Sequence, residues 1–303
     1  MITRHIVVAA SILAPALAGA QRNAAVPLIR EQTVAALSAE LSGSAAKRNL
    51  EFIARQHRMR GSKQFRVAAD FVASELRRYG YESTTIEMPA DGRTTYGTMR
   101  ARMAWDPEFA ELWEVRRDGA TTTPVSRMAS FEDEPVVLAQ DSDSADVTTE
   151  LVDVGAGTSE KDYATKDVRG KLVLISAQPR AAAPLAIDRF GAAGMVSYAP
   201  NQVTAWWKED ENLIRWGHLD PYSPRRTFAF MVSLKQARAL QMRMARGEQI
   251  VLHAVVQAAR HPGVYSVVTA TLLGSDPAMR GEEIVFSCHL DHQRPTPTDK
   301  AAL

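Results

Sequence analysis

Hydrophobic spacing predicts an amphipathic helix over residues 62–80. Five apolar positions recur at spacings of four, three, four and three residues, which places them on one face of a 3.6-residue period. They are Phe65, Ala69, Val72, Leu76 and Tyr79. Ser62 is suited to cap the start of this helix, and Gly80 is suited to end it. We therefore expect a helix that packs one face against a core.

The segments around this helix extend the pattern. Residues 28–41 and 45–56 also have helical spacing, so helices are expected before the first strand. Residues 81–88 are predicted to form that strand. Residues 57–62 lead into the helix and are expected to form its entry turn and cap.

The second half of the chain has a different pattern of predicted elements. Short β-rich runs at 149–155, 171–176 and 194–199 alternate with turn-rich pieces, which suggests a small β-rich unit. An amphipathic helix at 233–248, with a serine at its start and a glycine at its exit, and a strand at 249–257 are predicted to close that unit.

Long apolar strands are predicted again near the end of the sequence. Residues 264–274 and 284–288 are apolar runs, and runs of this kind belong to the interior of a sheet that is covered on both faces. The predicted fold class is therefore α/β, a sheet with helices on both faces. Its two parts, 21–124 and 259–303, are expected to be interrupted by an inserted β-rich domain at about 125–258.

Residues 1–20 have the order of a secretory signal peptide. Two polar residues with basic side chains precede an apolar run from Ile6 to Leu17, and three small residues follow. The run is too short to span a bilayer as a helix. We expect a mature chain that begins near Gln21 and is secreted or periplasmic. An uncleaved anchor that ends at Ala18 is the alternative.

The composition indicates what stabilises the fold and which class of partner can be excluded. The chain has 303 residues, of which 46% are hydrophobic, and this is enough for two cores. Its single cysteine, Cys288, cannot form an internal disulfide. The formal net charge is +1 at pH 7, and the sequence lacks a basic stripe with interleaved aromatic residues. Nucleic acid is therefore not an expected partner.

His289 and Asp291 are the candidate site residues. They follow the apolar run at 284–288, at the edge where open α/β sheets collect ligands and catalytic groups. A neutral imidazole is a good zinc ligand, and a carboxylate two residues later can hold its ring. Cys288 is adjacent and could suggest a nucleophile. Because strand side chains alternate, we expect Cys288 to be buried and to face away from His289.

Three stretches, in this order along the chain, support a resemblance to a known family. They are residues 53–82, which contain "HRMRGS", residues 149–198, and "EEIVFSCHLDH" at 282–292. Together they resemble the secreted zinc aminopeptidases with two co-catalytic zinc ions, the family that includes glutamate carboxypeptidase and the transferrin receptor. The resemblance implies a protease-associated domain at 125–258. It also implies a zinc-dependent exopeptidase that acts on the N-terminal residues of peptides.

The resemblance also implies roles for individual residues. His289 corresponds to the first zinc ligand, and Asp291 corresponds to the supporting active-site aspartate. Asp299 falls in the register of the aspartate that bridges the two zinc ions. The chain has Thr296 and Lys300 where close relatives have glycine and asparagine, so a polar residue in a frayed terminus is the alternative interpretation of Asp299.

The family's paired glutamates and later ligands have no match in the sequence. We therefore expect a chain that is truncated within the metal site and inactive as given, with an incomplete peptidase sheet. His218, His253 and His261 lack ligand-like spacing and are not expected to bind the metal. Two alternatives remain for the function: a non-catalytic binding ectodomain of the same architecture, and a one-zinc cyclase of related fold.

Overall fold

The computed structural model describes residues 29–119, 121–199 and 210–292. The expected signal peptide at residues 1–20 lies outside these ranges, and so does Asp299. Among the helices within these ranges, none combines the length and the apolar character that crossing a membrane requires.

The chain divides into two units, residues 1–46 and 47–303. Helix α1 (Glu31–Glu40) belongs to the first unit, and helix α2 (Gly43–Ala54) begins in it. Both helices occur where hydrophobic spacing predicts them, so these two predictions are confirmed. Helix α1 buries none of its residues, which leaves its apolar side chains exposed.

Helix α3 (Lys63–Arg78) confirms the strongest helix prediction. The Ser62 hydroxyl accepts a hydrogen bond from the Phe65 backbone N–H at 3.1 Å, and this satisfies a donor that the first helical turn leaves unpaired. At the other end, Gly80 adopts a left-handed conformation with φ 90°. Both predicted caps are therefore present.

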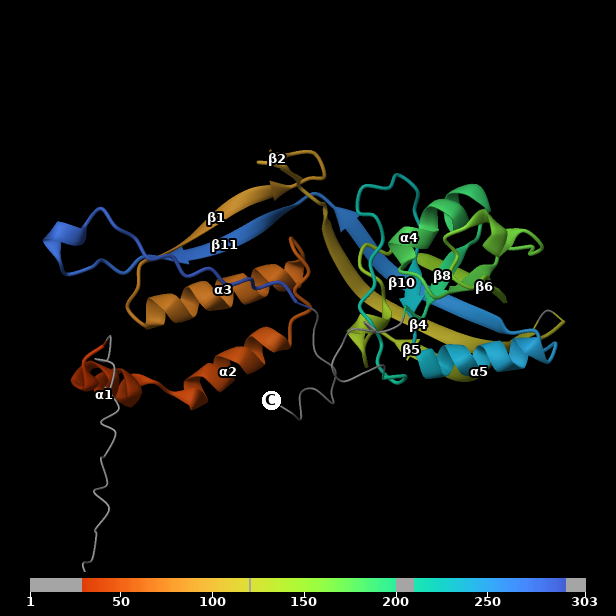
Figure 1. The fold of residues 1–303 in the computed structure, drawn as a ribbon, viewed down its shortest axis with the longest axis horizontal. Helices are drawn as coiled ribbons and strands as arrows, with labels where there is room; N and C mark the ends of the chain where they lie inside the picture. The colour runs from red at the N-terminus through yellow and green to blue at the C-terminus, as the bar shows by residue number, and fades with distance from the viewer. Residues whose placement is uncertain (1–28, 120, 200–209, 293–303) are drawn as a thin grey trace, which may run out of the picture. The chain divides into compact units, whose positions relative to one another are not determined.

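Helix α3 packs against an antiparallel ribbon of two strands, β1 (Ser83–Ala90) and β11 (Gly263–Ala270) (Figure 1). Strand β1 confirms the strand predicted after the helix. A short hairpin of β2 (Thr95–Tyr96) and β3 (Met99–Arg100) follows it. The ribbon joins two segments that are far apart in the sequence.

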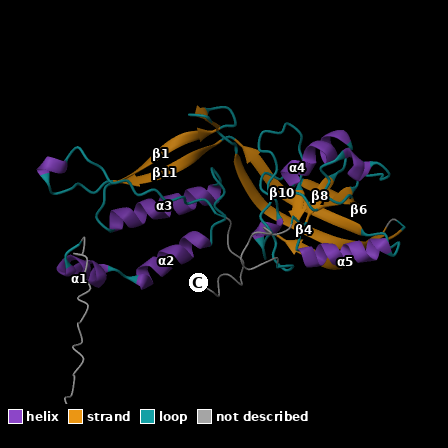
Figure 2. Cartoon of the chain, viewed as in Figure 1, coloured by secondary structure: helices purple, strands orange, loops and turns teal. Residues whose placement is uncertain are grey.

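The larger sheet has seven strands in the order β5-β4-β10-β6-β7-β8-β9. Strands β4, β6, β8 and β10 of this sheet are labelled in Figure 2. Neighbouring strands from β5 to β6 are antiparallel, and those from β6 to β9 are parallel. The strands are β4 (Ala104–Asp118), β5 (Thr121–Ser130), β6 (Ala145–Asp153), β7 (Leu172–Ile175), β8 (Gly194–Ser197), β9 (Ala229–Met231) and β10 (Val251–His261). Strands β6, β7, β8 and β10 confirm four predicted strands.

Helical segments cover both faces of the parallel part of this sheet. The helical segments that follow α3 in the chain are α4 (Pro179–Ala183), the π-helical η3 (Pro184–Arg189), α5 (Leu234–Ala245), η1 (Pro135–Val137), η2 (Glu160–Tyr163) and η4 (Pro277–Met279). Leu174 of β7 packs in one hydrophobic cluster with Leu240 of α5, and Val173 packs in the other with Ile187 of η3. Because successive strand side chains point to opposite faces, β7 is buried on both sides. The fold is mixed α/β, as predicted.

The predicted inserted domain at 125–258 supplies most strands of the larger sheet. The same sheet also includes β4, which begins at Ala104 and pairs with β10 along its length. A domain boundary at 124/125 would cross β5, which pairs with β4. The division into 21–124, 125–258 and 259–303 stays a prediction.

The strand predicted at residues 284–288 is wrong. These residues have no regular secondary structure, and the side chains of Ile284, Val285 and Phe286 are 88%, 78% and 91% exposed. A hydrophobic run becomes a strand only where a neighbouring strand pairs with its backbone N–H and C=O groups. No described segment pairs with it. Cys288, which was expected to be buried, is exposed for the same reason.

Candidate functional site

A short backbone pairing holds the predicted site residues in place. The Arg58 N–H donates to the His292 carbonyl at 2.8 Å, and the His292 N–H donates to the Arg58 carbonyl at 3.1 Å. These two bonds form an isolated antiparallel bridge outside the named strands. The bridge attaches the 289–292 segment to the turn that leads into α3.

The buried side chain of Arg58 strengthens this attachment. Its Nε donates to the Leu290 carbonyl at 2.9 Å, and its Nη1 donates to the carbonyls of Gln56, at 2.9 Å, and Ile53. Burial lowers the pKa of Arg58, and the nearby Asp291 raises it. Since a guanidinium remains charged in proteins, Arg58 is a buried cation whose charge is directed onto carbonyl oxygens. It therefore links the end of α2, the turn and the site segment.

Asp291 lies between His289 and Arg60. Nδ1 of His289 is 3.1 Å from the Asp291 carbonyl oxygen and 3.5 Å from its Oδ1. The other carboxylate oxygen of Asp291, Oδ2, is 3.5 Å from Nε of Arg60. The imidazole is 79% exposed, and within the described residues no partner is found for its Nε2. This nitrogen is therefore the one available to an external ligand.

The described residues do not complete a zinc site. Within these ranges, no three side chains of His, Cys, Asp or Glu come together as a metal-binding group. A catalytic zinc ion takes about three protein ligands. His289 supplies one imidazole, while the carboxylate of Asp291 is directed toward Arg60 and the His289 ring. Further ligands would have to come from outside the described ranges, where Asp299 lies.

Three other histidines have surroundings of a different kind. Nε2 of His253 is 2.9 Å from Oδ1 of Asp146, and Nε2 of His261 is 2.7 Å from Oδ2 of Asp106. The pKa of His218 is lowered, mainly by burial and further by two arginines. Two of the three imidazoles are thus paired with a carboxylate. The lowered pKa of the third, His218, favours its neutral form.

The turn at residues 57–62 contributes two arginines that sequence spacing alone does not identify as site residues. Gly61 allows this turn, because it has φ 74° and a Cβ there would lie 3.3 Å from the Cβ atoms of both Ala90 and Ala104. One feature of the sequence does point to these two arginines. Two cations directly before a helix N-terminus are unfavourably placed with respect to the helix dipole, so they require acceptors elsewhere in the fold.

Comparison with known proteins gives distant similarities. No family model and no curated protein sequence matches the chain. Similar solved structures include an aminopeptidase from Aneurinibacillus sp. strain AM-1, with 19% identity, 78% of this chain and 49% of that chain covered, and a TM-score of 0.45. A peptidase M28 precursor from Shewanella amazonensis SB2B has 14% identity, coverages of 78% and 52%, and a TM-score of 0.48.

A zinc aminopeptidase from Bacillus subtilis has 16% identity, coverages of 74% and 46%, and a TM-score of 0.43. The chain spans about half the length of these structures. At these identities and TM-scores, the function has to be argued from the residues of this chain.

Proposed function

We propose that this protein is a zinc-dependent exopeptidase that removes N-terminal residues from peptides. The observation that carries the proposal is the His289–Asp291 pair, in which Nδ1 of the imidazole is engaged and the exposed ring leaves Nε2 to solvent. Histidines that bind metals commonly direct their second nitrogen to a carbonyl or carboxylate, which fixes the tautomer and the orientation of the ring. The pair has this arrangement.

Each residue of the site has a proposed role. Asp291 keeps a proton on Nδ1 of His289, so that the lone pair of Nε2 is directed outward. Arg60 orients the carboxylate of Asp291, and Arg58 holds the whole segment against the turn. Asp299 would supply a further carboxylate ligand for zinc. Zinc, when bound, supplies the Lewis acidity that peptide hydrolysis requires.

The cellular context is part of the same proposal. Residues 1–20 have the pattern of a secretory signal, so we infer that the substrates are peptides outside the cytoplasm. We also propose, from the sequence, that residues 125–258 have protease-associated character and serve to restrict access to the site.

The test uses the complete gene product, loaded with zinc and then dialysed. Zinc per chain is measured by atomic emission, and hydrolysis is measured with unblocked peptides and amino-acid anilides. We expect His289→Ala to lower bound zinc and abolish hydrolysis. We expect Asp291→Asn to keep more zinc but lose about 10–100-fold in activity, as is typical for partners of metal-binding histidines. His253→Ala is the control, because it removes an imidazole that also has a carboxylate partner.

Three results would count against the proposal. If His289→Ala leaves the zinc content unchanged, His289 is not a ligand. If both variants lose zinc equally, the roles of His289 and Asp291 are not divided as proposed. If the unmodified protein binds no zinc and hydrolyses none of the substrates, the protein is not a zinc exopeptidase, and a binding function becomes the better explanation.

A further inference from the structure

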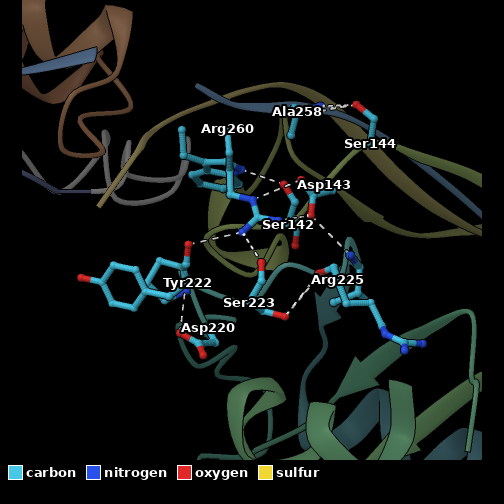
Figure 3. Close-up of polar contacts among 12 residues, drawn as sticks. Ser142, Asp143, Ser144, Asp220, Tyr222, Ser223, Arg225, Ala258 and Arg260 are labelled. Carbon is cyan, nitrogen blue, oxygen red and sulfur yellow. Dashed lines mark hydrogen bonds and ion pairs between the residues drawn. The ribbon is translucent and has the colours of Figure 1, made fainter. Parts of the chain in front are cut away.

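A cavity of about 240 Å³ lies beside the larger sheet. Its walls come from the segment of α4 and η3, the loop at residues 219–227, the loop after η1, and the end of β10. Figure 3 shows five polar residues of this wall: Asp143, Asp220, Ser223, Arg225 and Arg260. The exposed side chains of Arg180 and Arg225 line the cavity, so it reaches solvent.

Two residues that line the cavity each have a polar side-chain atom without a partner. Oδ2 of Asp141 and Oγ1 of Thr227 are buried and have no hydrogen-bond partner within the described residues. Asp141 is only 3% exposed. Buried polar groups in native proteins are almost always hydrogen-bonded. A ligand with hydrogen-bonding groups in the cavity would supply partners for these two residues.

The backbone at Asp141 is also unusual. It has φ 67°, and within the described ranges it is the one residue other than glycine with a positive φ. The preceding residue is held through both of its backbone groups, because the Gln140 N–H donates to the Gly217 carbonyl at 2.9 Å and the Leu219 N–H donates to the Gln140 carbonyl at 2.9 Å. A strained conformation that its surroundings maintain is typical of ligand-binding positions.

Four other charged residues of the wall form two ion pairs. Arg260 binds Asp143 through two hydrogen bonds, Nε to Oδ1 at 3.1 Å and Nη2 to Oδ2 at 2.6 Å (Figure 3). Arg225 is paired with Asp188 at 2.9 Å. Arg180 lines the cavity, and within the described part of the chain no ion pair is found for its guanidinium. Asp220 also lines the cavity, where it accepts a hydrogen bond from the Tyr222 N–H at 3.2 Å, and no ion pair is found for it among the described residues. Of the two carboxylates without an ion pair, Asp141 is the buried one, and Arg180 is the corresponding cation.

The protonation state of Asp141 agrees with a ligand that carries a cationic group. Burial raises the pKa of Asp141 to about 6, against the lowering effects of Arg102, Arg260 and Arg60 and with a further rise from Asp143. At neutral pH the carboxyl group of Asp141 is ionised in most of the molecules. The cavity therefore presents a buried carboxylate whose most favourable partner is a cationic donor.

We propose that this cavity binds a free α-amino acid with an aliphatic side chain. Its ammonium group binds the carboxylate of Asp141 and the hydroxyl of Thr227, and its carboxylate faces Arg180. Its side chain lies against the apolar part of the wall, which includes Ile187 and Leu219. A cavity volume of about 240 Å³ lies below the roughly 300–1,000 Å³ of most small-molecule sites, which suits a ligand as small as one amino acid.

The test measures binding by titration calorimetry at pH 7.5, with L-leucine as the probe. The complete gene product carries His289→Ala, so that binding or hydrolysis at the proposed zinc site does not contribute. We expect one leucine per chain, and weaker binding of N-acetyl-L-leucine, which lacks the ammonium group, and of L-leucinamide, which lacks the carboxylate. The proposal does not depend on the proposed peptidase activity, and this assay does not measure that activity.

Asp141→Asn should weaken leucine binding about tenfold or more, since it removes a charge-assisted hydrogen bond. Asparagine accepts a positive φ, so this variant is expected to fold, and circular dichroism checks that it does. Arg180→Gln should weaken the binding of leucine but not that of leucinamide. Asp133→Asn, at an exposed carboxylate of the same unit, is the control and should bind leucine as before.

Three outcomes would overturn the inference. The first is that L-leucine gives no saturable heat. The second is that folded Asp141→Asn binds leucine as tightly as the control variant, which would place leucine elsewhere. The third is that N-acetyl-L-leucine binds as tightly as leucine, which would show that the ammonium group is not recognised.

Discussion

Replacing Asp141 by asparagine should stabilise the ligand-free protein at neutral pH and leave its stability almost unchanged in acid. The side chain is 3% exposed, and its Oδ2 has no hydrogen-bond partner among the described residues. An ionised carboxylate in such a place costs free energy that a neutral amide of the same shape does not. Asparagine also tolerates the left-handed backbone at this position.

The magnitude follows from the pKa of Asp141, which burial raises from 3.8 to about 6. In the folded protein the carboxyl group keeps its proton up to about pH 6, whereas in the unfolded chain it loses the proton near pH 4. The free energy of unfolding therefore falls as the pH rises through this window. A rise of about two pKa units corresponds to about 3 kcal/mol above pH 6, and this is the stabilisation expected for Asp141→Asn at pH 7.5.

The assay is urea unfolding followed by tryptophan fluorescence, at pH 7.5 and at pH 4, on protein dialysed free of small molecules. Asp133→Asn is the control, because that carboxylate is exposed and paired with Arg127. The control should change little at either pH, since exposed ion pairs contribute about 0–1 kcal/mol. If Asp141→Asn destabilises the protein at pH 7.5, or shifts its stability equally at both pH values, the carboxylate is not a buried, unpaired charge.

Further predictions concern the entry turn and the β10 strand end. Arg58→Met should lower the free energy of unfolding by about 2 kcal/mol or more, because it removes hydrogen bonds from a buried cation, and hydrogen exchange should quicken around Leu290. Gly61→Ala should cost more than about 1 kcal/mol in urea unfolding, since its φ is 74° and the added Cβ would be crowded. Asp106, followed by a backbone carbonyl, raises the pKa of His261. The resulting stabilisation is fully present below pH 6.5 and is lost as the pH rises through the raised pKa, and Asp106→Asn should remove this pH dependence of the unfolding midpoint.

Matched variants make these predictions specific. Arg55→Met removes an exposed arginine of the same region and should have little effect on exchange around Leu290. Gly80 has φ 90° but no heavy atom within 4 Å of an added Cβ, so Gly80→Ala should cost less than Gly61→Ala. Equal costs would show that crowding at Gly61 is unimportant. An unchanged pH profile in Asp106→Asn would mean that His261 does not couple to folding.

Local patterns in the sequence were sufficient for most of the regular elements. The apolar spacing of residues 62–80 predicts α3 together with both of its ends, because a helix and its caps depend on residues within a few positions of one another. The same is true of α5, where Ser233 and Gln236 form the reciprocal bonds of a capping box. The short apolar runs that become β6, β7 and β8 are likewise visible without the fold.

Contacts between distant segments could be decided only by the tertiary structure. The run at 284–288 is as apolar as a buried strand, yet without a pairing neighbour among the described residues it is exposed and irregular, because a strand is completed by another segment's backbone. Arg58 reaches Leu290 across 232 positions of sequence, and no spacing rule connects them. The unpaired carboxylate of Asp141 is a property of the cavity that surrounds it. In each case the outcome depends on whether a remote part of the chain supplies a partner, and local periodicity does not contain that information.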